Sequence, residues 1–287
     1  MRTATDGPEI TPRQAADLLD ALCEIVSRAA QATLAIPYSS VAHRLKDDQS
    51  PVTAADEASE AIILEGLARV LPGVPVIAEE SVAKATGALA PRGPLGASFL
   101  LVDPLDGTKE FLAGRGEFTV NVALVTNGVP IAGIVAAPAQ GLLWRGVVGG
   151  KAEWLRLKPG AAPGDATDRR FIAARKAPAR LTAAISRTHL DPATEDFLSR
   201  LPLEKSYPCG SSVKFCHIAE GVADVYPRLA PTREWDIAAG CAILAAAGGV
   251  TTAPDGGLLT FGNVAADFLV PAFIAWGDPR LSGLSEA

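Results

Sequence analysis

The sequence predicts an α+β fold, in which long helices precede a block of hairpin-linked strands. Two amphipathic segments come first, at residues 12–35 and 53–70. Short apolar segments follow, separated by the turn dipeptides Asn127-Gly128 and Gly149-Gly150. Because strands joined by tight turns pair antiparallel, this order predicts an antiparallel sheet and disfavours an alternating βαβ repeat.

Size and composition restrict the class of protein. The 287 residues are 48% hydrophobic and 20% charged, with a net charge of -6, which favours a folded core and disfavours binding to a nucleic-acid polymer. No apolar run approaches a membrane span, and residues 1–11 lack the apolar core of a signal peptide. Four scattered cysteines without a CxxC pair suggest reduced, buried thiols. We therefore expect a cytoplasmic protein.

The two N-terminal helices have recognisable starts and ends. Thr11 is the expected cap of the first helix, with Pro12 at its first position, and Ile36-Pro37 ends it. Thr53 begins the second helix, which Leu71-Pro72-Gly73 closes. The apolar residues expected to face inward are Ala15, Leu18, Leu19, Leu22, Ile25 and Val26 in the first helix, and Ala54, Ala58, Ile62, Leu64 and Leu67 in the second.

The rest of the chain divides at a segment rich in Pro, Gly, Ala and Asp, residues 156–169. We expect strands at 74–78, 98–103, 118–125, 131–136 and 142–148 before it, and at 171–174, 181–185 and 223–226 after it. Helices are expected at 191–201, 213–221 and 235–247, the last stopped by Gly248-Gly249. These elements predict two subdomains, residues 1–158 and 159–287.

The segment Asp103-Pro104-Leu105-Asp106-Gly107-Thr108 is the most informative part of the sequence. We expect its strand to end at Asp103, so that this carboxylate projects beyond the sheet. The N–H groups of Gly107 and Thr108 then lie at a helix start, where an anion binds favourably. Two hard oxygen ligands beside an anion site suit Mg2+ and a phosphate ester. The alternative is an ordinary polar turn.

Three further carboxylates lie at predicted element ends. Glu79 follows a strand and Asp236 begins a helix, although a solvated acidic surface and a helix cap are the respective alternatives. Asp56 is spaced to form a capping box with Thr53. The functional interpretation places Asp56 against the Thr108 hydroxyl, as a pair that accepts a proton.

A second group of candidates lies in the second half. The loop Gly210-Ser211-Ser212 precedes a helix and either cradles a ligand or supplies an ordinary cap. Lys214 and Arg228 are either partners of a second phosphate or solvated charges. The spacing of three from Asp103 to Asp106 differs from the Asp-x-Asp-Gly-Thr motif of haloacid-dehalogenase-type phosphatases, which disfavours a phosphoaspartate mechanism.

Several of these motifs together resemble the inositol monophosphatase superfamily of metal-dependent, lithium-sensitive phosphatases. The resemblance covers residues 46–249 and is closer to the branch of bacterial 3'(2'),5'-bisphosphate nucleotidases. The superfamily motifs are Ser50-Pro51-Val52-Thr53-x-Ala55-Asp56, Glu79-Glu80-Ser81, Asp103 to Thr108, and Trp235-Asp236-x-Ala238-Ala239-Gly240. The segments that resemble the nucleotidase branch are 106–111, 116–121, 210–216 and 226–228.

The resemblance implies a layered αβαβα sugar-phosphatase fold and a site with two or three Mg2+ ions. The implied metal ligands are Glu79, Asp103, the Leu105 carbonyl, Asp106 and Asp236. The implied substrate contacts are Leu105, Asp106, Gly107, Thr108, Gly210, Ser211, Ser212, Lys214, Arg228 and Asp236. The implied reaction converts adenosine 3',5'-bisphosphate, a by-product of sulfate activation in sulfur metabolism, to AMP and phosphate. In it, Thr108 and Asp56 accept a proton from the attacking water.

Other functions share the same motifs. An inositol monophosphatase or a fructose-1,6-bisphosphatase would have the same metal ligands, and a catalytically silent phosphate- or metal-binding subunit is the alternative outside enzymes. The sequence also leaves open a homodimer as the oligomeric state and peripheral contact with the inner membrane.

The metal assignment predicts that Asp103→Asn loses most phosphatase activity while the fold survives, because an amide replaces a charged oxygen ligand. Phosphate release at saturating Mg2+, with circular dichroism as the fold control, measures both. Near-normal turnover by this variant would contradict the assignment.

Overall fold

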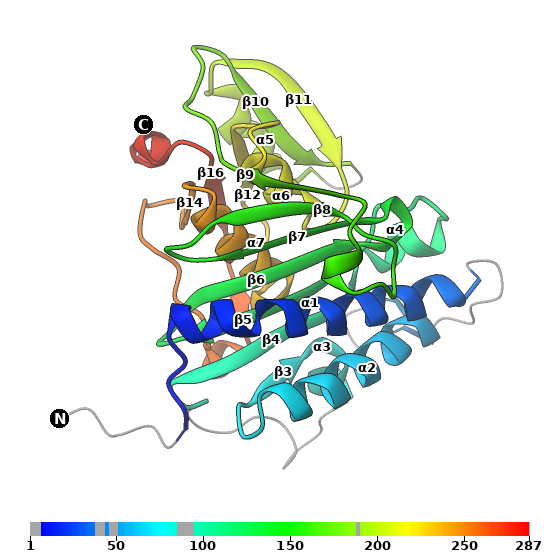
Figure 1. Ribbon diagram of the computed structural model, residues 1–287. Helices are drawn as coiled ribbons and strands as arrows, with labels where there is room; N and C mark the ends of the chain where they lie inside the picture. The colour runs from blue at the N-terminus through cyan, green and yellow to red at the C-terminus, as the bar shows by residue number, and fades with distance from the viewer. Residues whose placement is uncertain (1–6, 38–43, 46–50, 85–94, 188–189, 287) are drawn as a thin grey trace.

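The computed structural model describes residues 7–37, 44–45, 51–84, 95–187 and 190–286. Ser50, part of the motif that precedes the second helix, lies outside these residues. Five layers alternate between helices and sheets, in the order α1 and α2, a seven-stranded sheet, α6 and α7, a five-stranded sheet, and α5 (Figure 1). The predicted α+β class and αβαβα layering are confirmed.

The first sheet has the strand order β3-β4-β5-β6-β7-β8-β9. Strands β3 and β4 are parallel, and the remaining neighbours are antiparallel, as the hairpin signals predict. The strands are β3 (Val76–Ala78), β4 (Ser98–Asp106), β5 (Thr119–Thr126), β6 (Val129–Ala137), β7 (Leu142–Val147), β8 (Ala152–Arg156) and β9 (Asp168–Ile172).

Strand β9 differs from the prediction for this part of the chain. A strand at 171–174 was expected to open the second half, but β9 pairs with β8 at the edge of the first sheet. The Pro- and Gly-rich segment before it is therefore a connection within one sheet. The second sheet begins with β10 (Leu181–Ser186), and the subdomain division at 158/159 stays a prediction.

Helices α1 (Pro12–Ala35) and α2 (Ala54–Val70) lie side by side across one face of the first sheet (Figure 1). Thr11 and Gln14 form a capping box at the start of α1, and Thr53 and Asp56 form one at the start of α2, where it was predicted. The helix ends at Ile36 and Leu71 also agree with the sequence.

The inward face of α2 was predicted only in part, since Ile62 and Leu64 are partly buried against the core. Among the residues expected inside, only Leu67 is buried, and the buried face is rotated by about one residue along the helix. It carries the polar side chains of Asp56, Ser59 and Glu60 among its apolar ones. The spacing of apolar residues therefore does not predict the buried face of α2, because several of the buried residues are polar.

The second sheet is mixed, with the order β11-β10-β12-β16-β14. Helices α6 and α7 lie between the two sheets, and α5 packs against the outer face of the second sheet. The elements here are β11 (Leu203–Cys209), β12 (Val225–Arg228), β14 (Val250–Thr252), β16 (Phe273–Trp276), α5 (Pro192–Ser199), α6 (Val213–Ala219) and α7 (Glu234–Ala246). The remaining α-helices and strands of the described residues are β1 (Arg44–Leu45), β2 (Pro51–Val52), α3 (Glu79–Lys84), α4 (Thr108–Leu112), β13 (Thr232–Arg233) and β15 (Leu269–Val270).

Helices cover both faces of the first sheet, which explains its continuous apolar strands. In β4, Leu100 and Val102 join the core beneath α1 and α2, whereas Phe99 and Leu101 join the core beneath α6 and α7. This alternation fixes which residues of β4 face α7. Within the described part of the chain, no helix is long and apolar enough to cross a membrane.

Close packing of α7 on the sheet predicts a sensitive position at Gly133 in β6. A Cβ there would meet the backbone carbonyl of Ala239 and lie 2.9 Å from its Cα. We expect Gly133→Ala to destabilise the fold by about 1–3 kcal/mol and to lower activity, because α7 carries Asp236. Urea unfolding measures the change, with Gly164→Ala as the control, since nothing lies within 4 Å of a Cβ at that position. Equal stabilities of the two variants would contradict the packing.

Candidate active site

A β-bulge in β4 brings Asp103 and Asp106 to the same face of the sheet. Asp103 pairs with Asn121, and Asp106 pairs with Thr119, with a register shift between the two pairs. Three steps along β4 thus match two steps along β5, so one extra residue is accommodated. Without the bulge, residues three apart in a strand would point to opposite faces. The strand therefore does not end at Asp103 as predicted but continues to Asp106.

The polar face of α2 holds the bulge and the segment after β3. The Ser59 hydroxyl donates to the Pro104 carbonyl over 2.7 Å, which fixes the backbone within the bulge. The Glu60 carboxylate accepts from the Glu80 amide at 2.9 Å and from the Ser81 hydroxyl at 2.6 Å. These bonds fix the start of α3, where Glu79 is the first residue.

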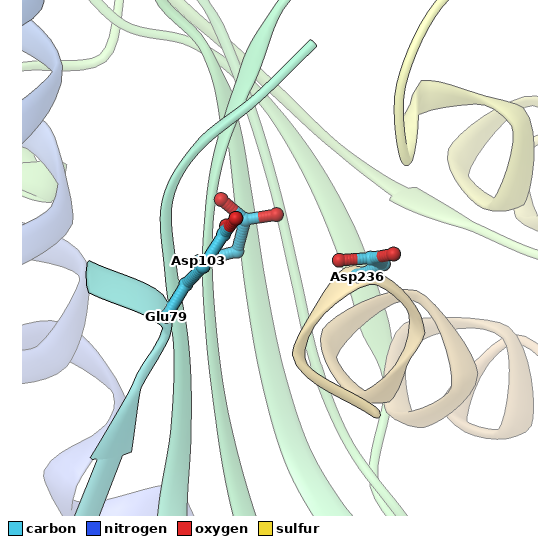
Figure 2. A group of neighbouring side chains, drawn as sticks. All are labelled: Glu79, Asp103 and Asp236. Carbon is cyan, nitrogen blue, oxygen red and sulfur yellow. The ribbon is translucent and has the colours of Figure 1, made fainter. Parts of the chain in front are cut away.

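Three carboxylates converge beside the bulge. One oxygen from each of Glu79, Asp103 and Asp236 lies within 4.8 Å of the other two. In Figure 2 the carboxylates of Glu79 and Asp103 point toward each other, and Asp236 faces them from the first turn of α7. The predicted grouping of these three residues is thus present in the fold.

Asp236 both caps its helix and faces this group, so the two alternatives for it are compatible. Its Oδ2 accepts from the Arg233 amide at 3.1 Å and from the Thr232 hydroxyl. Both bonds go to one oxygen, and they fix the direction of the carboxylate.

Burial and mutual repulsion disfavour the charged forms of the aspartates. Burial raises the pKa of Asp103 well above its ordinary value, and the nearby Glu79, Asp106 and Asp236 raise it further. Burial and Asp236 raise the pKa of Asp106 to about 7, although Lys214, Arg228 and the Ser212 amide oppose this shift. The group therefore favours an added cation or bound protons.

The donor set fits a hard divalent cation. Glu79, Asp103 and Asp236 supply only carboxylate oxygens, which suit Mg2+, Ca2+ or Mn2+ better than a thiolate-preferring metal. Desolvating several carboxylates together is costly unless a cation compensates their charge. Asp106 and the Leu105 carbonyl, the other two predicted ligands, lie on the same bulge, and their place in this set stays a prediction.

The predicted contact between Thr108 and Asp56 is also present. The Thr108 hydroxyl lies 3.3 Å from Asp56 Oδ1 and 3.3 Å from the Leu105 carbonyl. The other oxygen, Oδ2, accepts from the Thr53 amide at 2.8 Å and the Thr53 hydroxyl at 2.6 Å. Asp56 therefore both caps α2 and contacts Thr108.

Gly107 connects the bulge to α4 in a left-handed conformation, with φ of +93°. A Cβ here would also approach the Glu117 carbonyl at 3.2 Å, so both backbone angle and space favour glycine. No side-chain cap occupies this helix start among the described residues. The Gly107 and Thr108 amides remain our predicted phosphate contacts.

A cavity of about 520 Å³ lies beside the carboxylates and between the two halves of the chain. Of the predicted substrate contacts, Leu105 and Thr108 do not line it, and neither do the metal-ligand candidates Glu79 and Asp103. The predicted residues that line it are Asp106, Gly107, Gly210, Ser211, Ser212, Lys214, Arg228 and Asp236.

The cavity wall includes residues that sequence reasoning did not select. Asp191 and Thr194 begin α5, and Lys109 and Glu110 lie in α4. Asp191 accepts from the Thr194 amide at 2.9 Å, so its sequence signal is that of an ordinary helix cap. That Asp191 and Thr194 also line the cavity becomes apparent only from the packing of α5 beside it.

The comparisons with known proteins agree with this geometry. Residues 13–277 match the profile of the inositol monophosphatase family. The chain belongs to this family. It is accordingly a phosphatase, as the sequence predicts.

Individual relatives refine the family assignment. The chain is 40% identical over 240 residues to the 3'(2'),5'-bisphosphate nucleotidase CysQ of Escherichia coli K12, covering 80% of this chain and 88% of that protein. The crystal structure of CysQ from Bacteroides thetaiotaomicron matches with a TM-score of 0.73 and 34% identity, over 89% of this chain and 95% of that one. An inositol monophosphatase from Anabaena, 24% identical with a TM-score of 0.71 over 94% of each chain, shares the fold.

The raised pKa values predict how the metal-free protein responds to pH. Because Asp106 holds its proton up to about pH 7 when folded but only to about 3.9 when unfolded, its contribution to stability falls as pH rises between these values. Asp103 repels the charged form of Asp106, so we expect Asp103→Asn to raise the Tm at pH 8 without metal. Because the variant also lacks a charged metal ligand, we expect Mg2+ not to stabilise it.

Thermal melts from pH 4 to 8, with and without Mg2+, test this expectation. Glu65→Gln, which changes an exposed carboxylate on α2, is the control. An unchanged Tm for metal-free Asp103→Asn at pH 8 would contradict the repulsion described for this group.

Proposed function

We propose that the protein is a Mg2+-dependent 3'(2'),5'-bisphosphate nucleotidase that hydrolyses adenosine 3',5'-bisphosphate to AMP and phosphate. The observation that carries the proposal is the group of carboxylates from Glu79, Asp103 and Asp236 beside a cavity of about 520 Å³, which is also lined by three cationic side chains, those of Lys109, Lys214 and Arg228. We place it in the cytoplasm, and its four buried free cysteines are consistent with a reducing compartment.

Four carboxylates are assigned to the metal ions. Glu79, Asp103, Asp106 and Asp236 carry a charge of about -4 when ionised, which two Mg2+ ions would balance. When bound, Mg2+ would polarise the phosphate, lower the pKa of water and stabilise the leaving 3' oxygen. The chain's own contribution is to hold these oxygens in one place before the substrate arrives.

Thr108 and Asp56 are assigned to proton transfer. The Thr108 hydroxyl can accept a proton from the attacking water and donate its own to Asp56 Oδ1, 3.3 Å away. The Thr53 bonds to Asp56 Oδ2 fix that carboxylate, so its second oxygen stays directed at Thr108. The Thr108 hydroxyl is well placed for this step because it lies near both the Asp56 carboxylate, which acts as the base, and the Leu105 carbonyl.

Lys214 and Arg228 are assigned to the second phosphate. Both line the cavity that Asp106 and Asp236 border. The Lys214 ammonium donates to the Ser211 carbonyl at 2.6 Å and the Cys209 carbonyl at 3.5 Å, which leaves one of its three donors for a ligand. An inositol monophosphate has no second phosphate to use these charges, and this favours a bisphosphate. The 40% identity to a bisphosphate nucleotidase supports the same choice.

Phosphate release from adenosine 3',5'-bisphosphate, inositol 1-phosphate and fructose 1,6-bisphosphate, compared side by side, tests the proposal. We expect the nucleotide to have the highest kcat/KM, with activity that requires Mg2+ and is inhibited by Li+. The physical reason is that inositol 1-phosphate lacks a second phosphate for Lys214 and Arg228, and fructose 1,6-bisphosphate lacks a base to fill the rest of the cavity.

Preference for an inositol or sugar phosphate would overturn the proposed substrate. Hydrolysis without any divalent metal would overturn the metal assignment. Absence of release from all three esters would favour a silent binding protein.

A further inference from the structure

Ser212 does not behave as the helix cap that its position suggests. It directly precedes α6, where a serine normally accepts from an amide of the first turn. Here no side-chain cap bond is formed, and Ser212 as a whole is only 3% exposed. Its hydroxyl forms hydrogen bonds with side chains of β5 instead, and these bonds attach the loop before α6 to the first sheet.

The partners of Ser212 are two residues of β5. Its hydroxyl donates to Asn121 Oδ1 over 2.7 Å and lies 2.8 Å from the Thr119 hydroxyl. Because a serine hydroxyl has one proton, Thr119 must be the donor in the second bond. Thr119 and Asn121 are buried at 0% and 1% exposure. Buried hydrogen bonds of this kind fix relative positions firmly.

The register of the sheet connects these partners to the carboxylates. Thr119 lies directly opposite Asp106, and Asn121 lies directly opposite Asp103. The Ser212 amide also faces the Asp106 carboxylate and lowers its pKa. Ser212 therefore contacts the strand that adjoins the bulge while its loop, with Gly210 and Ser211, lines the cavity.

We propose that Thr119, together with Asn121, is a positioning residue that acts through Ser212 to hold the 210–212 loop at a fixed place beside the bulge carboxylates. The inference rests on the proposed function, in which this loop and Lys214 contact the substrate. Lys214 is included because its ammonium bonds to the Ser211 carbonyl. Release of Ser212 would move the loop and the cation together.

A double-mutant cycle tests whether Thr119 acts through Ser212. We expect Thr119→Val to raise the KM for adenosine 3',5'-bisphosphate about tenfold, as expected for loss of a buried hydrogen bond, and Ser212→Ala, which also loses the Asn121 bond, to raise it at least as much. The double variant should show the same rise as Ser212→Ala alone and not the product of the two single effects, because Thr119 acts only through Ser212. The kcat should change by less than about threefold, since the bonds that orient Asp103 and Asp236 do not involve Ser212. Thr119→Ser keeps the hydroxyl and should restore the wild-type KM.

Thr126→Val is the matched control for loss of a buried threonine hydroxyl. Thr126 lies at the other end of β5, where its hydroxyl bonds to Ser98 at 2.8 Å and to the Ile10 carbonyl at 2.9 Å. It should lower the Tm as Thr119→Val does, without changing KM. Hydrogen exchange provides a readout besides activity: amides 210–214 should exchange faster in Thr119→Val and not in Thr126→Val.

Two results would overturn the positioning role. One is a Thr119→Val enzyme with wild-type KM and wild-type exchange in the loop, and the other is single-variant effects that multiply in the double variant. The wild-type substrate panel decides the proposed function separately, and the cycle is measured with the ester that the wild type hydrolyses fastest. If it hydrolyses none, unchanged loop exchange in Thr119→Val alone overturns the role.

Discussion

The site depends on one irregularity in one strand, the bulge between Asp103 and Asp106. Because of the bulge, two carboxylates that are three residues apart lie on the same face of the sheet, and this face is covered by α7, the helix that carries Asp236. The bulge is held from both sides. Ser59 on α2 binds the Pro104 carbonyl, and Thr119 and Asn121 on β5 lie opposite the two aspartates. The layers on either side of the sheet therefore determine where the carboxylates lie.

Several side chains stabilise the fold and serve the site at the same time. In Asp56, one carboxylate oxygen caps α2 and the other faces the Thr108 hydroxyl. In Asp236, one oxygen accepts from residues 232 and 233 while the carboxylate faces Asp103. Because local bonds orient these carboxylates before any ligand binds, little reorganisation is needed when a metal and phosphate arrive. A helix cap and the proposed role in the site are thus compatible in one residue.

The sequence predicts the helix boundaries and the converging carboxylates well, because caps, turn dipeptides and apolar periods are local signals. The sequence-based prediction fails for features that are determined by contacts between residues far apart in the chain. The buried face of α2 was misjudged because Asp56, Ser59 and Glu60 point inward to serve other segments. The bulge escaped notice since an Asp-Pro-Leu-Asp segment also suits a turn. Ser212 resembled a cap, and only the register of β5 shows where its hydroxyl goes. Strand β9 followed a boundary-like segment but pairs with β8.

The most direct test of this account is the position of bound metal. Anomalous scattering from crystals grown with Mn2+ and adenosine 3',5'-bisphosphate would locate the ions without reference to activity. The account predicts ions ligated by Glu79, Asp103, Asp106 and Asp236 together with the Leu105 carbonyl, and an intact bulge with both aspartates on the face toward α7. Ions bound elsewhere, or Asp106 turned away from Asp103 to the opposite face of the sheet, would contradict it.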